Sequence, residues 1–496
     1  MIKMFKIMFV LICLLIQILF IYILYLLLIN NVRIVGLLYS IYCMYFILKI
    51  IKKSKSYSFT LPWIIVFLIL PIPGSLLYII INKNLKNSTF INKIISEEDE
   101  SKKYLKQESL DKDSCSSIMN YISNYSKYPI TNNNDVEYYP LGDLAYKPML
   151  DELKNAKKFI FMEYFIIKHG KMWSSILNIL EEKVKEGVEV RLMYDDFGCF
   201  YNLNSSYCKN LEKKGIKCIS FNKLKPFGGV VMNNRDHRKI LVIDGIVAFS
   251  GGINLADEYI NIGSKYGHWK DNSIKITGDA VWSYTVMFLT LWNAVKKEDD
   301  NYEVYKYKFK KSKTSKGFVA PYGQNPFDGK NVGEDVYLNI INRANNYLYI
   351  CTPYLIIDTD IINALILAAK RGVDVRIIIP AIPDKKIVYT LSESYIEPLA
   401  QVGVKIYKYT PGFIHSKVFV SDDIKATVGT INMDYRSLYM HFECGCYFEL
   451  EKVIKNIKND LVETIEKSHL VTKKEAQTGY LKSFWQSILR LFAPLM

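Results

Sequence analysis

The sequence predicts an α/β protein in which two similar domains, related by a pseudo-twofold axis, follow N-terminal transmembrane helices. Three observations support this fold class: one eight-residue pattern occurs twice, the segments around its two copies also match, and a long apolar stretch precedes both. Within the matched segments, apolar runs alternate with amphipathic runs, which is the order of strands and helices in an α/β fold.

Three apolar runs fill the N-terminus, and we expect each of them to be a membrane segment. They cover about residues 7–29, 34–50 and 59–81. The first run is interrupted only by Gln17, and it exceeds the roughly 20 residues that cross a hydrocarbon core of about 30 Å. A signal peptide is the alternative, but the run is too long and no small-residue cleavage site follows it.

Basic residues near these runs set the expected orientation. The cluster between Lys49 and Lys55 favours the cytoplasmic side, and so do Lys3 and Lys83. Three complete spans cannot satisfy all of these residues, so either one preference is overruled or the third run turns back at its Pro71-Ile-Pro-Gly break. We therefore expect a multi-pass protein of the cell membrane whose catalytic domains lie in the cytoplasm.

Composition divides the rest of the chain. Residues 96–134 are polar and charge-mixed, and the charged stretch Lys306–Lys316 suits a solvated linker better than a contact with lipid headgroups. In the tail, Leu481, Phe484 and Trp485 share one helical face, which suits either an interfacial helix or a terminal helix packed on the core. The expected parts are membrane segments at 1–95, a linker at 96–134, a first domain at 135–305, an inter-domain linker at 306–330, a second domain at 331–470 and an amphipathic tail at 471–496.

The repeated pattern, H-x-K-x4-D, is the most specific feature of the chain. Each copy is followed after six residues by a small-residue turn that ends in Asn. The residues that define the copies are His237, Lys239, Asp244 and Asn254 in the first and His415, Lys417, Asp422 and Asn432 in the second. The chain has only six His, so a chance match of both copies and their flanks is improbable. A His and a Lys two residues apart, used twice, suit phosphodiester exchange through a covalent phosphohistidine.

Each copy is expected to form a strand and a hairpin. Alternation would place His237 and Lys239 on one face of a strand, and Asp244-Gly245 predicts a turn before a return strand. The second copy repeats this plan with a strand at 414–420 and a turn at 421–423. A structural role therefore suits the two aspartates at least as well as a catalytic one.

Matching strings extend the repeat beyond the pattern. Lys185–Arg191 corresponds to Lys370–Arg376, and the strands expected at 188–194 and 373–379 are continuous apolar runs. Such runs are typical of strands buried on both faces. We therefore expect a mostly parallel or mixed sheet in each half, with the two patterns facing one central cleft.

Charge and cysteine content narrow the function less sharply. The net charge of +15 suits an anionic membrane or nucleic acid, but a general bias toward Lys, Ile, Asn and Tyr explains it equally well. The nine Cys are scattered and include no C-x2-C pair. Neither a zinc site nor a disulfide framework is expected, and a reducing environment is the simplest inference.

The two patterns with their Gly-Gly-Ile-Asn and Gly-Thr-Ile-Asn tails resemble the phospholipase D superfamily, so the domains are expected to be phospholipase D-like. The apolar N-terminus, Met162–Phe165, Tyr194–Gly198 and Thr352–Tyr354 resemble bacterial cardiolipin synthases, although two apolar segments, not three, are usual there. The resemblance implies that two phosphatidylglycerol molecules give cardiolipin and glycerol, without a nucleotide cofactor or a metal. It also implies contact with phosphatidylglycerol and anionic membrane lipids, and no nucleic-acid partner.

By the same resemblance, His237 is the nucleophile and His415 is the general acid and base, a distinction that the residues alone do not make. Lys239 and Lys417 would hold the phosphoryl oxygens as charge develops on them. His268 would lie in the core or behind the site, and we expect the same of His441.

Four further residues complete the expected site. Asn254 and Asn432 would donate hydrogen bonds to the phosphoryl oxygens, while Asp271 and Glu443, in matched positions after each Asn, would hold the second nitrogen of an imidazole. Glu163 is a weaker candidate, because an acidic residue in an apolar strand suggests a cleft position.

Other functions use the same pattern. A phospholipase would pass the phosphatidyl group to water, and a membrane-tethered nuclease would attack nucleic-acid phosphodiesters. The apolar N-terminus favours a lipid substrate. A noncatalytic scaffold is disfavoured, because both copies retain every essential residue type.

Overall fold

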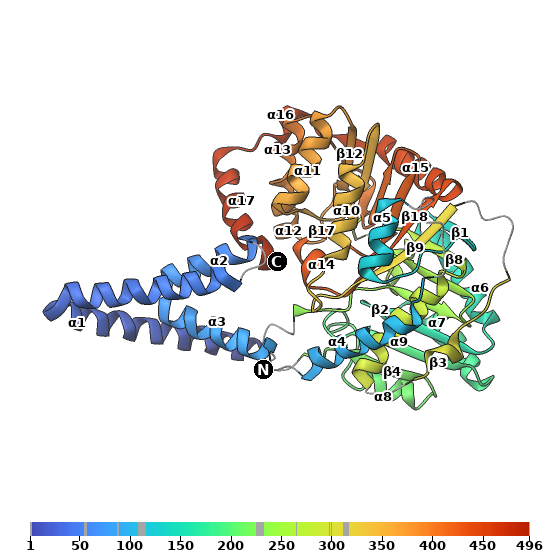
Figure 1. The fold of residues 1–496 in the computed structure, drawn as a ribbon, viewed down its shortest axis with the longest axis horizontal. Coiled ribbons are helices and arrows are strands. Elements are labelled where there is room, and N and C mark those ends of the chain that lie inside the picture. Colours follow the sequence, from blue (N-terminus) through green and yellow to red (C-terminus); the bar gives the residue numbers. More distant parts are fainter. Residues whose placement is uncertain are drawn as a thin grey trace. The chain divides into compact units, whose positions relative to one another are not determined.

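The computed structural model describes residues 2–53, 57–86, 89–107, 116–224, 233–263, 265–296, 298, 300–310 and 317–495. For part of the N-terminal helices, residues 2–14 and 80–86 among them, it describes only the backbone. The chain forms two compact units (Figure 1). Unit 1 comprises residues 1–88, 224–232 and 487–496, and unit 2 comprises residues 89–223 and 233–486.

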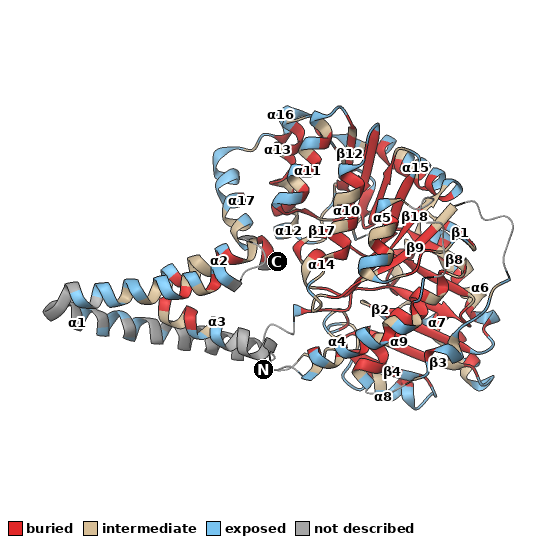
Figure 2. Ribbon diagram, viewed as in Figure 1, coloured by how far each residue is buried: buried red, intermediate tan, exposed pale blue. Residues whose placement is uncertain are grey.

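The N-terminal part of unit 1 forms the helices α1 (Ile2–Lys53), α2 (Tyr57–Ile69) and α3 (Pro71–Lys86), and the end of the chain adds part of one further helix. A small apolar cluster packs α1, α2 and α3 together, in which the rings of Phe46 and Phe67 stack with centroids 5.5 Å apart. Many other described apolar side chains of these helices are exposed (Figure 2). Leu15, for example, is 65% exposed and Leu37 is 63% exposed.

The structure differs from the three predicted membrane segments. The runs at 7–29 and 34–50 are parts of one continuous helix. The run at 59–81 is divided, because Pro71 has no N–H to continue α2 and instead begins α3. The 13 residues of α2 rise only about 20 Å. In the part of the chain that the structure describes, no helix combines the length and the hydropathy of a membrane span, so the predicted transmembrane helices are not supported.

Unit 2 is an α/β structure with two mixed sheets of the same topology, as predicted. The first sheet has the order β4-β3-β2-β5-β6-β8-β1 and the second the order β19-β13-β12-β10-β15-β16-β18-β9. In each sheet three parallel strands are followed by antiparallel ones that begin with the hairpin of the repeated pattern. Apart from the edge strand β19, the first half (residues 134–305) and the second half (residues 317–470) repeat one another.

The strands of the first sheet are β1 (Asn134–Tyr139), β2 (Phe159–Tyr164), β3 (Glu189–Asp195), β4 (Lys217–Phe221), β5 (Ile240–Ile243), β6 (Val247–Gly251) and β8 (Ser273–Gly278). Those of the second are β9 (Gly317–Gln324), β10 (Tyr347–Cys351), β12 (Asp374–Pro380), β13 (Lys405–Tyr409), β15 (Val418–Ser421), β16 (Lys425–Gly429), β18 (Glu443–Leu450) and β19 (Ser468–Leu470). Two small two-stranded sheets pair β11 (Leu355–Ile356) with β17 (Met433–Asp434) and β7 (His268–Lys270) with β14 (Gly412–Ile414).

Helices cover both sheets. Those of the first half are α6 (Gly142–Asn155), α7 (Lys171–Lys185), α8 (Tyr207–Glu212) and α9 (Val281–Lys296), with the short η5 (Asp257–Ile260) and η6 (Tyr302–Tyr305). The second half and tail contain α10 (Val332–Asn342), α11 (Thr359–Lys370), α12 (Lys386–Glu393), α13 (Ile396–Gln401), α14 (Tyr435–Tyr439), α15 (Glu451–Glu466), α16 (Lys473–Ala476), α17 (Tyr480–Phe492) and η7 (Ala493–Leu495).

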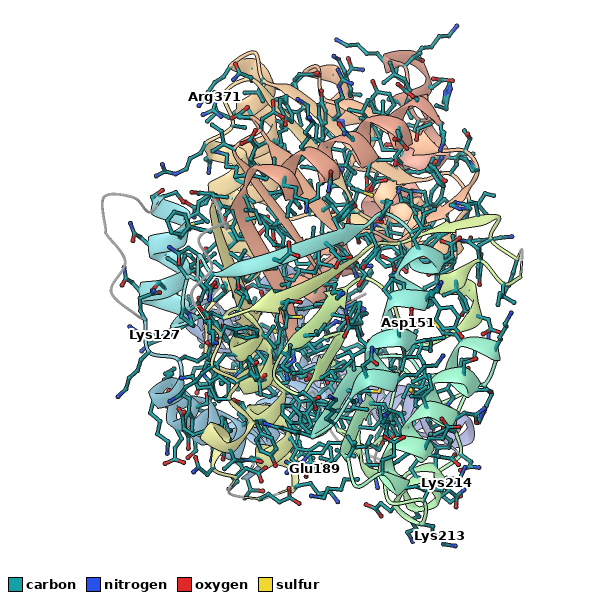
Figure 3. All side chains as sticks on the ribbon, turned by 90° about the vertical axis from the view of Figure 1, so that its right-hand side faces the viewer. Lys127, Asp151, Glu189, Lys213, Lys214 and Arg371 are labelled. Atoms are coloured by element: carbon teal, nitrogen blue, oxygen red, sulfur yellow. The ribbon has the colours of Figure 1, made fainter. Side chains whose placement is uncertain are left out.

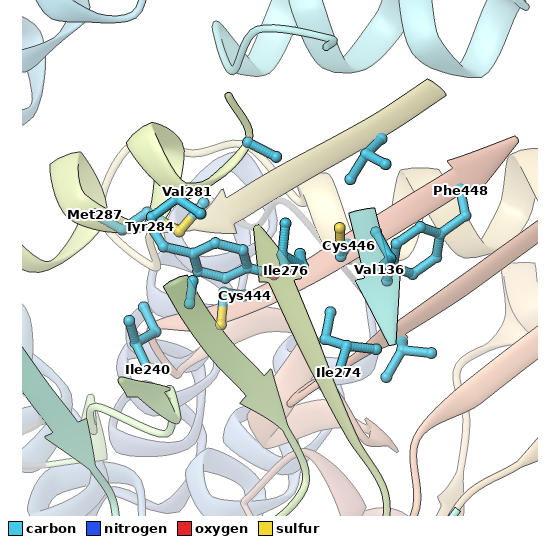
Figure 4. Close-up of a cluster of buried hydrophobic side chains, with 14 of the residues drawn as sticks. Val136, Ile240, Ile274, Ile276, Val281, Tyr284, Met287, Cys444, Cys446 and Phe448 are labelled. Atoms are coloured by element: carbon cyan, nitrogen blue, oxygen red, sulfur yellow. The ribbon is translucent and has the colours of Figure 1, made fainter. Parts of the chain in front are cut away.

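The two halves share one core. Helix α9 follows the first sheet but also contacts β9 of the second, and α15 follows the second sheet but also contacts β1 of the first. Tyr284 of α9 lies in this shared core near Ile276 and Cys446, which come from different sheets (Figure 4). Charged side chains such as Lys213 and Arg371 instead project from the surface (Figure 3). The two sheets are therefore packed as one body, which fixes the two patterns relative to each other.

Two predicted linkers are partly structured. Residues expected in the linker at 96–134 belong to α4 (Thr89–Ser101), η1 (Lys102–Tyr104), α5 (Ser117–Tyr121) and η3 (Ile122–Ser126). Helix α4 packs on α9 through buried Ile91 and Ile94. Within the predicted linker at 306–330, residues 317–324 form β9, which pairs along its whole length with β18. Residues 108–115 and 311–316 lie outside the described part.

Candidate active site

The histidine and lysine of each pattern lie just before a strand. His237 and Lys239 precede β5, which begins at Ile240, and His415 and Lys417 precede β15. The single strand predicted at 414–420 is therefore divided into β14 and β15. The prediction was wrong here because the backbone on the N-terminal side of each pattern pairs with the other half of the molecule.

These pairings are reciprocal. Strand β14 pairs in parallel with β7, and Asp236 pairs in parallel with Phe442. The backbone N–H of His237 donates to the carbonyl of Phe442 (2.9 Å), and that of His415 donates to the carbonyl of Lys270 (2.7 Å). Each histidine therefore lies beside the acidic residue that follows its backbone acceptor. This residue is Glu443 for His237 and Asp271 for His415.

The result is two crossed histidine–carboxylate pairs. Nδ1 of His237 lies 2.9 Å and 3.0 Å from the carboxylate oxygens of Glu443, and Nδ1 of His415 lies 2.6 Å from Oδ2 of Asp271. All four side chains are buried. With Nδ1–H donated to the carboxylate, Nε2 of each imidazole keeps a lone pair for chemistry. Neither half contains a complete pair of its own.

The paired lysines lie within the same site. Lys239 Nζ donates to the carbonyl of His237 (2.6 Å), and Lys417 donates to that of His415. Lys417 Nζ also lies 2.9 Å from Nδ1 of His415, a contact that cannot be a hydrogen bond while Nδ1 donates to Asp271. Burial lowers the pKa of Lys239 to about 7 and that of Lys417 to about 8. An anionic phosphoryl group between them would restore both charges.

The surroundings of both histidines disfavour the charged form of the imidazole. Burial, followed by the charges of Lys239 and Lys417, holds the pKa of His237 well below its ordinary value. Burial and Lys417 lower the pKa of His415 to about 4, although Asp271 opposes them. Aromatic rings line both imidazoles: Phe165 lies 4.9 Å from His237 between centroids. Tyr259 and Trp269 lie 5.5 and 5.6 Å from His415.

The two carboxylates have opposite environments. Burial raises the pKa of Glu443 well above its ordinary value, and the hydroxyl of Thr430 donates to it. Burial acts in the same direction on Asp271, but His415 and Lys417 outweigh it and hold the pKa low. Gly252 stands where Thr430 stands in the other copy, and a Cβ there would lie 1.9 Å from Oδ1 of Asp271. Only glycine leaves room for this carboxylate.

The two asparagines are engaged with the protein. Oδ1 of Asn254 accepts from the N–H of Ile166 (3.0 Å), and its Nδ2 donates to the hydroxyl of Tyr259 (2.7 Å), whose ring packs on His415. Asn432 lowers the pKa of Asp434 by hydrogen bonding, and its Oδ1 has no partner among the described residues. Asn254 thus positions an aromatic wall of the site.

Asp244 and Asp422 lie at the far ends of their strands, in the predicted turns. Both have positive φ, 54° and 57°. The carboxylate of Asp244 accepts the backbone N–H groups of 157–159 at 2.7–2.9 Å, and that of Asp422 accepts those of 345–347 at 2.8–2.9 Å. Both carboxylates thus tie their hairpin to the start of the neighbouring strand, which is the structural role that the turn pattern suggested.

Glu163 forms an ion pair with Arg238, the residue between His237 and Lys239. Its carboxylate accepts from Nε of Arg238 (2.6 Å), and Arg238 also lies near Asp236. His268 is outside the crossed pairs, with Nδ1 2.9 Å from the hydroxyl of Tyr409. Sequence reasoning missed the charge network around Arg238, for which the unbroken run of polar and charged residues 233–239 before β5 was the available signal.

His441 is the unexpected member of the site. Its ring centroid lies 5.6 Å from that of His237, and its Nδ1 lies 3.7 Å from Glu443. His237, His441 and Glu443 each offer a metal-ligand atom within 4.8 Å of the others, and so do Glu334, Asp358 and Asp360 elsewhere in the described part. Catalysis without a metal remains a prediction.

Comparisons with known proteins identify the family of the chain. Residues 149–273 and 337–465 match the family described as "Cardiolipin synthase, PLD-like domain". The chain is 43% identical over 460 residues to an uncharacterized protein of Streptococcus mutans (91% of this chain, 99% of that protein). It is 32% identical over 447 residues to a cardiolipin synthase of Alkalihalophilus pseudofirmus (88% and 89%).

A solved structure supports the fold. The phosphatidylserine synthase of Haemophilus influenzae aligns with 77% of this chain and 98% of its own, with a TM-score of 0.58 and 15% identity. Duplicated halves and relatives that transfer phosphatidyl groups define an enzyme of the phospholipase D type, a phosphatidyltransferase. Within that class, the chain belongs to the cardiolipin synthase family.

Proposed function

We propose that the enzyme joins two phosphatidylglycerol molecules into cardiolipin and releases glycerol, through a phosphohistidine intermediate. The observation that carries this proposal is the pair of crossed histidine–carboxylate contacts, His237–Glu443 and His415–Asp271. Two equivalent imidazoles with free Nε2 atoms allow one to hold the phosphatidyl group while the other moves protons. Splitting one displacement into two makes each step easier.

In the first step, Nε2 of His237 attacks the phosphorus of the donor lipid, and a P–N bond forms as the P–O bond to glycerol breaks. Protonated His415 gives its Nε2 proton to the departing glycerol oxygen. The bound phosphodiester is an anion beside Lys239 and Lys417, and it favours the charged form of His415. His415 therefore takes up this proton when the donor lipid binds.

In the second step, His415 accepts the proton of a hydroxyl on the second phosphatidylglycerol. That oxygen attacks the phosphorus from the side that glycerol left, the P–N bond breaks, and His237 is restored. The site ends with the same protons that it had at the start, so no cofactor is consumed.

The environments of the carboxylates support this division of roles. Asp271 keeps its charge, which suits a partner that must stabilise imidazolium on His415. Glu443 has a raised pKa, which suits a partner that orients a neutral nucleophile. His237 accordingly stays neutral, and a neutral imidazole is the nucleophilic form.

We also propose that unit 1 and the tail attach the enzyme to the membrane, with unit 2 on the cytoplasmic side. The exposed apolar side chains of α1 to α3 support lipid contact. In α17, Leu481 (75% exposed), Phe484 and Trp485 form a further exposed apolar face beside Lys482. Alkaline carbonate extraction of membranes tests the attachment: the full chain should stay with the bilayer, and release into the supernatant would contradict it.

Mass spectrometry of vesicles of pure phosphatidylglycerol tests the reaction. The intact protein should give cardiolipin and free glycerol, and His237→Ala should give neither. Phosphatidic acid without cardiolipin would instead show a hydrolase, and cleavage of nucleic acid without lipid turnover would contradict the lipid substrate.

A further inference from the structure

A group of cationic side chains surrounds His441 beside the crossed pairs. Four cations lower the pKa of His441 electrostatically after burial has done so: Arg436, Lys239, Arg235 and Lys385. The reaction proposed above uses only Lys239 of these four. Two of the remaining three, Arg235 and Arg436, form with His441 a cluster that the first step of the reaction does not explain.

Backbone contacts hold this cluster in place. The N–H of Phe442 donates to the carbonyl of Arg235 (2.8 Å), and the N–H of His441 donates to that of Arg436 (3.0 Å). Residues two apart share a face of an extended segment, so Arg235 lies on the same face as His237. By the same spacing, His441 lies on the face of Glu443.

Several polar atoms of the cluster lack a partner in the described part of the chain. His441 is 7% exposed, and neither ring nitrogen is hydrogen bonded. Arg235 is 1% exposed: its NH1 donates to the carbonyl of Asn222 (2.8 Å) and lies 3.7 Å from Asp195, but its NH2 has no partner. Buried donors without partners are costly unless a ligand satisfies them.

The nearby carboxylates compensate for this charge only in part. Burial raises the pKa of Asp195 to about 7 and also raises that of Asp434. Arg436 is half-buried, and Asp434 is the acidic neighbour that acts on its pKa. Arg235 is buried with one donor that has no partner among the described residues, and the half-buried Arg436 lies near it. Such a pair is suited to a phosphate group, which accepts several hydrogen bonds at once.

We infer that Arg235, Arg436 and His441 form a second anion subsite that binds the non-reacting phosphodiester of the acceptor lipid. This inference rests on the proposed function, because cardiolipin contains two phosphodiesters joined by one glycerol. In the proposed reaction the reacting phosphodiester is held by Lys239 and Lys417, so the acceptor must place its own phosphodiester nearby. The subsite would therefore favour a phospholipid acceptor over water or a simple alcohol.

The test compares two acceptors in one assay. The full-length enzyme is supplied with vesicles of phosphatidylglycerol in buffer that contains ethanol, and cardiolipin and phosphatidylethanol are quantified together. Both products need donor cleavage, but only cardiolipin needs an anionic acceptor. Loss of one charge-assisted hydrogen bond typically reduces binding about 10- to 100-fold.

Arg436→Gln should therefore lower the ratio of cardiolipin to phosphatidylethanol by about 10-fold or more, and Arg436→Lys should restore part of it. Arg343→Gln, at an exposed arginine of the second half, is the matched control and should leave the ratio unchanged. An equal fall in both products in Arg436→Gln would overturn the acceptor subsite while leaving the proposed function intact. Phosphatidic acid as the only product of the parental enzyme would overturn both.

Discussion

The two halves of unit 2 have the same topology but create different environments around His237 and His415. His237 faces Glu443, whose pKa is raised by burial. The carboxylate of Glu443 also accepts a hydrogen bond from the hydroxyl of Thr430. His415 faces Asp271, whose pKa is lowered. Two copies of one sequence pattern therefore need not have the same role in the reaction. The turn after each pattern differs in the same way: Thr430 accompanies Glu443, whereas Gly252 accompanies Asp271.

The largest expected effect separates the two histidines directly. With a phosphatidyl donor whose leaving group is p-nitrophenolate, departure needs no proton. His415→Ala should then still release nitrophenol, whereas His237→Ala should release none. With phosphatidylglycerol as donor, both variants should lose activity, since a positioned acid contributes typically about 10²–10⁴-fold. Nitrophenol release by His237→Ala alone would reverse the assignment.

The second prediction concerns Gly252 and Thr430, which occupy matched positions after the two patterns. Gly252→Ala places a methyl group against Asp271, so we expect about a 10²-fold loss of cardiolipin synthesis, because His415 loses its oriented partner. Thr430→Ala removes one hydrogen bond to the carboxylate of Glu443 and should lower the rate of cardiolipin synthesis by about 10-fold or less. Initial rates on phosphatidylglycerol vesicles measure both. A more severe loss in Thr430→Ala would mean that Glu443 is the more demanding partner.

A third prediction concerns acid stability. The pKa of folded His415 is about 4, against an ordinary 6.5. The unfolded chain therefore binds this proton more tightly between pH 6.5 and 4, and His415 makes the protein less stable as the pH falls through that range. His415→Asn should lose less of its free energy of unfolding on acidification, by on the order of 1 kcal/mol per pH unit. Parallel curves of Tm against pH would contradict this.

The smallest effect on chemistry is expected at the two turns. Asp244→Ala should lower the free energy of unfolding by about 2–3 kcal/mol, because three backbone N–H groups lose a charged acceptor. Asp422→Ala should cost less, since that carboxylate is less buried. Thermal unfolding measures both, and Asp244→Asn is the control, because Asn tolerates positive φ. The rate per folded molecule should stay near the parental value; its collapse would restore a catalytic role.

The repeat in the sequence picks out residues that the fold brings together. His237, His415 and both carboxylates follow from the repeat, because matched positions identify the residue types that the chemistry needs. The crossing of the pairs did not follow, since it depends on parallel pairing between segments about 200 positions apart, such as Asp236 with Phe442. The local alternation of residues also predicted one strand through each pattern. In the structure, the His and the Lys of each pattern instead precede the strand.

The α/β class and the mixed sheets followed from the alternation of buried strands and helices. The boundaries were less predictable, because polar segments such as α4 become ordered only by packing on α9. His441 was interpreted as a core or supporting residue. The N–H of His441 donates to the carbonyl of Arg436 in α14, and the N–H of Phe442 donates to the carbonyl of Arg235. The sequence does not reveal either contact.

The most direct test of the asymmetry is to trap the covalent intermediate. The parental enzyme and His415→Ala are mixed with a phosphatidyl donor that bears a nitrophenolate leaving group, quenched in denaturant at alkaline pH, and digested for peptide mass spectrometry. The account predicts a phosphatidyl adduct on His237 in both, accumulating in His415→Ala because the second step lacks its base. An adduct on His415 of the parental enzyme would contradict it.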